Sequence, residues 1–455
     1  MKVTKIFHTC FMVEHEGHRG LIDPALVFPI YATYVPREGI RLDLDVLLGQ
    51  HWDFVFISHS HRDHFDPYTL VRLPRETLIL HGSPAVNLPP FFDQLGFTNR
   101  RSIEPWEVHR VGPFELMPIP THTAGLETGL AIRDGGACFA HLIDVHTNDE
   151  INRGYVERWG PPQLFSPITL PSNEHHLSNA ETCRTKTHDE LRAMAREYRV
   201  YGAGHVILSG HDLAVAVVPW VNHRLFPNTP EEHVAAYRAE AVAPEVEFAR
   251  AGQWWRIAPG GVVESGTQTL GVNSGGPVYD GRFDSTVPVR PFGDRREFPA
   301  VADLARQAQD FETALLRIVS TVPAPERAIL REIGLWRYQI HHPEGISFDA
   351  VLDMRGEFPF WGEPRATEMN LTTLTSSGLA ALTQQLIGHH SMRICDQIRT
   401  TAPSSESRHD PSRRYPTSLS YDLTSIHRAV AGKGPWSAQH LPAGINFARA
   451  AFQYP

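Results

Sequence analysis

The sequence is poor in cysteine and has no long apolar run. Its four cysteines, Cys10, Cys138, Cys183 and Cys395, form no CxxC pair, which argues for a reducing compartment and against a structural zinc or iron–sulfur site. The longest apolar stretches, such as residues 213–218, are far shorter than the roughly 20 residues that cross a bilayer. The sequence therefore predicts no association with a membrane.

A signal peptide and a nucleic-acid partner are also not expected. The apolar stretch at the N-terminus is interrupted by His8, Glu14, His15 and Glu16, so it cannot serve as the core of a signal peptide. The chain has 42 basic and 51 acidic residues, a formal charge of −9, and no block of like charges, which does not favour a polyanionic partner. We expect a cytoplasmic protein.

Length and composition predict two folded domains. The 455 residues, 42% of them apolar, exceed the roughly 250–300 residues at which a single core stops growing. Strands alternate with helices up to about residue 225, which indicates a layered α/β domain at residues 1–225. Residues 226–455 are interpreted as a separate α+β domain that closes the cleft, shapes a substrate pocket or forms a homodimer.

The predicted elements of this second domain are helices and one strand region. Apolar spacing favours helices at 231–251, 300–321, 325–341 and 378–387, and strands within 346–360. Residues 402–416, rich in serine, arginine and proline, have no apolar periodicity and are expected to form an exposed loop. In the first domain, Thr187 and Glu190 predict a capping box at the start of a helix.

Histidine is the residue present in excess, with 26 copies. Four potential metal ligands fall within six residues, in the segment His59-Ser60-His61-Arg62-Asp63-His64. An apolar run at 53–58, expected to be a central strand, precedes them. Asp66 and Pro67 follow and can begin a helix. Ligands clustered on a strand-to-helix loop predict a metal site, and an ordinary group of polar residues is the disfavoured alternative.

The HxHxDH pattern resembles the metallo-β-lactamase superfamily over about the first half of the chain. The resemblance implies an αββα sandwich followed by the separate C-terminal domain. It also implies two metal ions bound at strand ends, with Asp144 bridging them and Asp63 helping to orient the reactive water. The metal ligands implied in this way are His59, His61 and His122 for one ion, and Asp63, His64 and His211 for the other.

Two of the implied ligands have rivals close by. Glu127 competes with His122, because a carboxylate can also serve an iron site. His141 and His146 compete with Asp144 for the bridging position. His122 and Asp144 are preferred, because each matches the superfamily pattern and Asp144 directly follows an apolar stretch.

The last implied ligand also has a rival. His205 competes with His211, but it begins its predicted strand, whereas His211 follows the end of that strand. The remaining histidine pairs are interpreted as surface or structural residues, with substrate contact as the alternative for the first pair: His175 with His176, and His389 with His390.

Two kinds of chemistry suit such a site. Two cations held by imidazoles and a shared carboxylate lower the pKa of a bound water, which supports a zinc- or manganese-dependent hydrolase of an ester, lactone or phosphoester. The same nitrogen and oxygen ligands also suit two irons that react with oxygen. A non-enzymatic binding protein is disfavoured, because all seven expected ligand positions are filled.

A finer resemblance favours the oxygenase. Residues 10–24, 59–67 and 95–106 look most like the branch containing the metallo-β-lactamase domain of CMP-N-acetylneuraminate hydroxylase, and the ascorbate-6-phosphate lactonase group is similar at the metal motif. The first branch implies a nonheme diiron oxygenase that hydroxylates an organic substrate, with a thioester-tethered acyl substrate as one hypothesis. This chain lacks the paired Cys-x-His motifs of a Rieske cluster, so electrons are expected from a separate reductase or ferredoxin.

Overall fold

The structure is a computed structural model of the 455-residue chain. The described residues are 1–30, 34–85, 88–122, 127–167, 184–215, 222–267, 269, 271–279, 301–321, 327, 331, 334–342, 345–357, 359–362, 370–375, 398–401 and 430. Among the described helices, none combines the length and the apolarity needed to cross a bilayer.

The first sheet has eight strands and contains the predicted central strand. Its order is β18 (Gly261–Gly266), β17 (Trp254–Ala258), β1 (Lys2–Phe7), β2 (Cys10–His15), β3 (His18–Ile22), β6 (Phe54–Ile57), β7 (Ile79–Gly82) and β8 (Arg100–Ile103). Strands β3, β6, β7 and β8 are parallel to one another, and β1 to β3 form an antiparallel meander. All four residues of β6 are buried, as expected for a strand covered on both faces.

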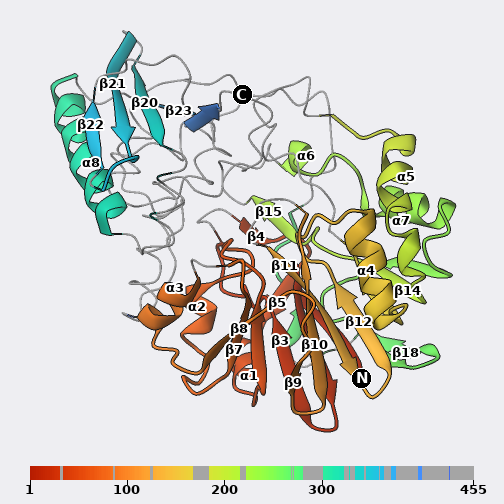
Figure 1. The fold of residues 1–455 in the computed structure, drawn as a ribbon. Coiled ribbons are helices and arrows are strands. Elements are labelled where there is room, and N and C mark those ends of the chain that lie inside the picture. Colours follow the sequence, from red (N-terminus) through yellow and green to blue (C-terminus); the bar gives the residue numbers. More distant parts are fainter. Residues whose placement is uncertain are drawn as a thin grey trace.

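The second sheet has seven strands and faces the first (Figure 1). Its order is β16 (Glu245–Phe248), β14 (His205–Leu208), β13 (Leu164–Ser166), β12 (Ala137–His141), β11 (Thr128–Asp134), β10 (Phe114–Pro120) and β9 (His109–Val111). Strands β12, β13, β14 and β16 are parallel, and β9 to β12 are antiparallel. Two short pairs flank the sheets: β4 (Tyr34–Pro36) with β15 (Leu213–Val215), and β5 (Ile40–Leu42) with β19 (Val272–Ser274).

Alternation along the strands divides the core into layers. In β6, Phe54 and Phe56 face the second sheet, whereas Val55 and Ile57 face the helices on the outer side. The helices of the first outer layer are α1 (Leu44–Leu48), α2 (Pro67–Leu70) and α3 (Leu88–Leu95). The second outer layer contains α4 (Asp149–Trp159), α5 (His188–Arg196), η2 (Arg199–Tyr201) and α7 (Pro230–Ala239), with the short α6 (Asn222–Leu225) nearby in the chain. The predicted αββα sandwich is confirmed.

Local signals at two helix starts are confirmed. Asp66 accepts hydrogen bonds from the backbone N–H groups of Tyr68 and Thr69, with Pro67 at the first position of α2. At α5, Thr187 and Glu190 make both hydrogen bonds of the capping box. Each cap satisfies backbone donors that have no partner within the helix.

The sandwich includes strands from beyond residue 225. Strand β17 pairs with β1, with Val3 opposite Trp255, and β16 pairs with β14 in the other sheet. The boundary predicted near residue 225 therefore falls inside the sandwich. The helix predicted at 231–251 is also corrected, because α7 ends at Ala239 and β16 begins at Glu245. The pattern Glu-Val-Glu-Phe alternates as a half-buried strand does, but it is too short to be separated from a helix by sequence alone.

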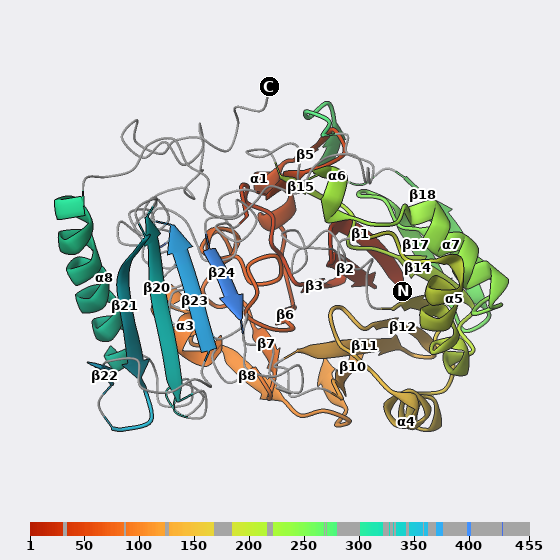
Figure 2. The same cartoon turned by 90° about the horizontal axis from the view of Figure 1, so that it is seen from above.

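The C-terminal part contains a second α/β unit. Helix α8 (Val301–Thr321), as predicted, lies along a five-stranded sheet in the order β22 (Phe360–Gly362), β21 (Gly345–Asp353), β20 (Leu335–His342), β23 (Asn370–Thr375) and β24 (Ile398–Thr401) (Figure 2). The helix predicted at 325–341 is wrong over β20, where Trp336, Tyr338 and Ile340 alternate along a strand and favour that conformation. The helix predicted at 378–387 and the loop at 402–416 lie outside the described residues.

Candidate metal centre

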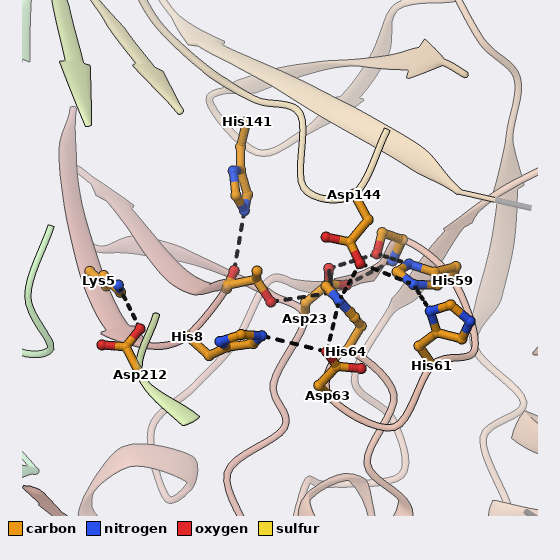
Figure 3. A network of polar contacts seen from close by, with 12 residues as sticks. Lys5, His8, Asp23, His59, His61, Asp63, His64, His141, Asp144 and Asp212 are labelled. Carbon is orange, nitrogen blue, oxygen red and sulfur yellow. Dashed lines mark hydrogen bonds and ion pairs between the residues drawn. The ribbon is translucent and has the colours of Figure 1, made fainter. Parts of the chain in front are cut away.

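One edge of the sandwich collects the chemically active side chains. Strands β1, β3 and β6 end there, and so do β10, β12 and β14 of the other sheet, because these strands run in the same direction within each sheet. The HxHxDH segment follows β6, and Asp144 lies on the loop after β12. Binding residues of layered α/β folds gather at such carboxyl ends. Figure 3 shows the resulting polar network.

Three of the predicted ligands form a compact group. One ligand atom each from His59, His61 and Asp144 lies within 4.8 Å of the other two. The Nε2 atom of His59 is 2.8 Å from Nδ1 of His61 and 3.8 Å from Oδ2 of Asp144. Ligands of one ion at about 2.1 Å lie roughly 3.0–3.4 Å apart in a tetrahedral or octahedral site. The three side chains therefore fit a metal ion.

The other half of the site is built on His64. Its Nε2 atom lies 3.1 Å from Oδ2 of Asp144 and 3.6 Å from Oδ2 of Asp63. The same oxygen of Asp144 is thus close to His59 and to His64, which is the position that a bridging carboxylate requires. His64 is thus within ion-pair distance of both carboxylates, and a second ion held by Asp63 and His64 stays a prediction.

Hydrogen bonds behind the cluster fix two of the imidazoles. Asp23, fully buried, accepts from the Ser58 backbone N–H (2.8 Å), the Ser58 hydroxyl (2.6 Å) and Nδ1 of His64 (2.9 Å). Nδ1 of His59 donates to the Ser58 hydroxyl oxygen at 2.9 Å. Both rings therefore keep Nε2 directed toward Asp144, an arrangement that orients metal-binding histidines.

The electrostatics of the cluster favour a cation. Burial alone would lower the pKa of His64, but the carboxylates of Asp63 and Asp144 outweigh burial and hold that pKa well above its ordinary value. Burial would raise the pKa of Asp63 and of Asp144, but His64 outweighs it, and both carboxyls have a lowered pKa. The proton on His64 thus compensates two carboxylates, and a metal ion would compete with it for the same nitrogen.

His122 lies at the same edge but outside the compact group. Its side chain is exposed, and its Nδ1 and backbone N–H each lie 2.8 Å from the His146 carbonyl oxygen. A bond from Nδ1 to a carbonyl leaves Nε2 as the metal-binding nitrogen. Residues 123–126, which follow it, lie outside the described part, so its role as a ligand stays a prediction. The rival Glu127 is buried and directly precedes β11.

His141 and His146, the alternatives to Asp144 as the bridging ligand, make contacts outside the cluster. His141 is fully buried, and its Nε2 lies 3.2 Å from the Thr9 carbonyl oxygen (Figure 3). Burial lowers its pKa to about 3, so the ring is neutral and donates to that carbonyl. His146 supplies its carbonyl to His122. Neither contact involves the cluster, which favours Asp144 as the shared ligand.

His211 lies beside two cationic side chains. Its ring packs on Phe226 at 4.2 Å, and its Nε2 lies 3.2 Å from a guanidinium nitrogen of Arg37. Burial, followed by the charges of Arg37 and Lys5, lowers its pKa to about 3. The geometry does not bring it into the compact group, and its role as a ligand stays a prediction. The rival His205 pairs with Glu247 at 2.8 Å at the opposite end of β14.

Sequence reasoning missed Asp23 and His8. Asp23 directly follows β3, and β3 is parallel to β6, so both strands end at the same edge. The sequence alone does not show this pairing, and without it Asp23 cannot be placed near the cluster. His8 lies between β1 and β2, and its Nε2 is 3.5 Å from Oδ2 of Asp63. The pairs His175 with His176 and His389 with His390 lie outside the described residues.

Comparisons with known proteins agree with this fold. Residues 2–156 match the profile of the beta-lactamase superfamily domain. A protein of Mycolicibacterium smegmatis that is named as a Rieske 2Fe-2S iron–sulfur protein is 32% identical over 102 residues. The match covers 22% of this chain and only 19% of that protein.

Solved structures show weaker likeness. An isothiocyanate hydrolase from Delia radicum gut bacteria is 15% identical with a TM-score of 0.41, covering 56% of this chain and 99% of that one. CmlA, a diiron β-hydroxylase from Streptomyces venezuelae, is 17% identical with a TM-score of 0.38, covering 54% and 52%. Neither likeness bears on activity. The profile match over residues 2–156 and the two facing sheets show that the N-terminal part of this chain has the metallo-β-lactamase fold and resembles the beta-lactamase superfamily domain, and His59, His61 and Asp144 form a group that could hold a metal ion.

Proposed function

We propose that this protein is a nonheme diiron oxygenase that hydroxylates an organic substrate. The observation that supports it is the donor set, which offers only imidazole nitrogens and carboxylate oxygens, with Asp144 between His59 and His64. Such donors without thiolate suit paired irons. Burial raises the pKa of the two described cysteines, that of Cys10 well above its ordinary value and that of Cys138 to about 12, so both remain protonated thiols.

The similarity to the M. smegmatis protein supports redox chemistry in place of hydrolysis. That relative is named for an iron–sulfur cluster, a group that transfers electrons. This chain carries no Cys-x-His pair for such a cluster. The electrons would therefore come from a separate reductase or ferredoxin, and an acyl group on a carrier thioester is the substrate class included in this proposal.

The residues of the chain have separate tasks in this proposal. Bound irons would supply the reaction with oxygen. His59 and His61 would hold one ion, Asp63 and His64 would hold the other, and Asp144 would be shared. Behind them, Asp23 and Ser58 fix the imidazoles through the hydrogen bonds of 2.6–2.9 Å described above. His122 and His211 are proposed to complete the two coordination shells.

Metal analysis of the protein purified without added metal tests this function. We expect two irons per chain, a Mössbauer spectrum of a coupled iron pair, and oxygen uptake when a chemical reductant is supplied. Asp144→Ala removes the shared carboxylate and is expected to lose both irons and the oxygen uptake. Two zinc ions per chain, with hydrolysis of a generic ester, lactone or phosphodiester and no oxygen uptake, would instead establish a hydrolase.

A further inference from the structure

We propose that His8 is a positioning residue for the second metal ion, acting through a hydrogen bond from its Nε2–H to Asp63. The inference rests on the proposed metal centre but concerns a residue outside the HxHxDH motif. His8 lies in sequence more than fifty residues from Asp63 and belongs to a different loop. Its predicted effect is on the affinity of one of the two ions, not on the fold.

The backbone at His8 has a left-handed conformation. Strands β1 and β2 are joined by a two-residue turn, with Phe7 opposite Cys10 across the ladder. His8 has φ = +51° in this turn, a left-handed conformation that disfavours most side chains and that glycine or asparagine adopts more easily. Non-glycine residues in such conformations cost on the order of 1–3 kcal/mol and cluster at functional sites.

The ring is directed into the site. Its exposed fraction is 9%, and its centroid lies 6.2 Å from that of His64. Figure 3 shows the imidazole pointing at Asp63, with its Nε2 3.5 Å from Oδ2. This distance is that of an ion-pair contact and is longer than an ordinary hydrogen bond, and catalytic hydrogen bonds that are long in an empty site often tighten when the site is loaded.

The hydrogen-bond inventory assigns the proton to Nε2. A carboxylate only accepts, so a neutral imidazole beside it carries its proton on the nearer nitrogen. The buried Nδ1 atom of His8 has no hydrogen-bond partner among the described residues, so nothing there requires the other tautomer. The role therefore needs only the neutral ring and does not depend on protonation of His8.

Asp63 has less support than His59 and His64. His64 is fixed by Asp23, and His59 is fixed by Ser58. The side chain of Asp63 is 25% exposed, and its ion-pair contacts among the described residues are with His8 and His64. Because His64 is itself a ligand, His8 is the residue that can hold the carboxylate from behind. Loss of such outer contacts typically weakens metal binding by about 10- to 100-fold.

Two substitutions separate this role from packing. His8→Gln places an amide N–H near the position of Nε2, whereas His8→Asn places it near Nδ1, too far from Asp63. Asparagine also tolerates the left-handed backbone better than glutamine, so a folding defect would be smaller in His8→Asn. The control is His205→Asn, which removes another histidine–carboxylate contact, with Glu247, at the opposite end of β14.

The test is calorimetric titration of the metal-depleted full-length protein with Co²⁺, together with its thermal unfolding midpoint. In His8→Asn we expect one of the two Co²⁺ sites to lose about 10- to 100-fold in affinity while the other is unchanged. His8→Gln is expected to restore most of the affinity, and His205→Asn to bind both ions normally.

Three outcomes would overturn the proposal. Normal binding at both sites in His8→Asn would show that the contact is irrelevant. Equal weakening of both sites in His8→Asn and His8→Gln, with a matching loss of thermal stability, would show a structural role only. A wild-type protein that binds fewer than two Co²⁺ ions would overturn the dinuclear centre itself and the role of His8 with it, a failure distinguishable from the first two.

Discussion

The imidazoles of the cluster are held from the side that faces away from the metal positions. Asp23 is the residue on which this support converges, since it accepts three hydrogen bonds, two from Ser58 and one from His64. Burial raises its pKa, and the hydrogen bonds from His64 and Ser58 only partly oppose that effect. The residue therefore orients Ser58 and His64 behind the cluster.

Removing this carboxylate should affect both the fold and the metal. In Asp23→Ala, buried donors of Ser58 and His64 lose their acceptor, at a cost of about 1–3 kcal/mol of unfolding free energy, and metal affinity should fall by about 10- to 100-fold. Urea unfolding of the metal-free protein and metal titration measure the two effects.

A matched control is Asp53→Ala. Asp53 also accepts from a backbone N–H, that of Arg19, and from the ring of His18, but it precedes β6 and so lies at the opposite end of the strand. Asp53→Ala should lower the free energy of unfolding without lowering the affinity for metal. Equal metal affinity in both variants would contradict the role assigned to Asp23.

At this scale the sequence predicts the contiguous ligands and little of their support. His59, His61, Asp63 and His64 are adjacent in the chain, so their spacing alone indicates a metal site. Asp23 and His8 contact them only because β1, β3 and β6 end at one edge. That neighbourhood depends on strand order, which residue spacing does not encode.

Among the elements, α7 combines a strong start signal with a buried titratable group. Thr229 and Glu232 form a capping box around Pro230, and His233 in the first turn is 4% exposed. Burial, aided by the charge of Lys186, lowers the pKa of His233 to about 4. The helix therefore packs on the second sheet with a neutral histidine.

This group predicts an acid-sensitive helix. The folded-state pKa lies below the unfolded value of about 6.5, so the unfolded chain takes up the proton first as the pH falls. Stability is complete above about pH 6.5 and declines toward pH 4, by about 2 kcal/mol between pH 7.5 and 5. The free energy of unfolding of His233→Gln, measured with chelator present, should vary less with pH than that of the wild type.

The exposed His51 provides the comparison for that measurement. His51→Gln tests whether any histidine-to-glutamine change alters the profile. Parallel pH profiles for the wild type and His233→Gln would show that this histidine does not contribute to the acid sensitivity.

Helix caps were easier to predict than the helix or strand type of the segments that follow them. The caps at Asp66 and Thr187 are local signals, and both are confirmed. Strand β16 follows α7 after a short turn, and its four residues suit either conformation until they pair with β14. In β20, tertiary pairing with β21 and β23 selects the strand, because intrinsic helix preference is only a weak guide.

At the scale of the whole molecule, distant segments close the sandwich. Strand β17 adds Trp255, fully buried, to the core between the sheets and pairs with β1, whose end carries His8. A strand more than 240 residues further along the chain thus supports the edge at which the metal site lies. The composition of the segment around β17 does not indicate that it pairs with β1. For this reason the sequence placed the end of the first domain near residue 225, before β17.

The central claim is a dinuclear centre in which Asp144 is shared. Anomalous diffraction at the iron edge, from crystals of protein purified without added metal, tests it most directly. The account predicts two peaks per chain, one beside His59 and His61 and one beside Asp63 and His64, with Asp144 between them. A single peak, or two peaks without Asp144 between them, would contradict it.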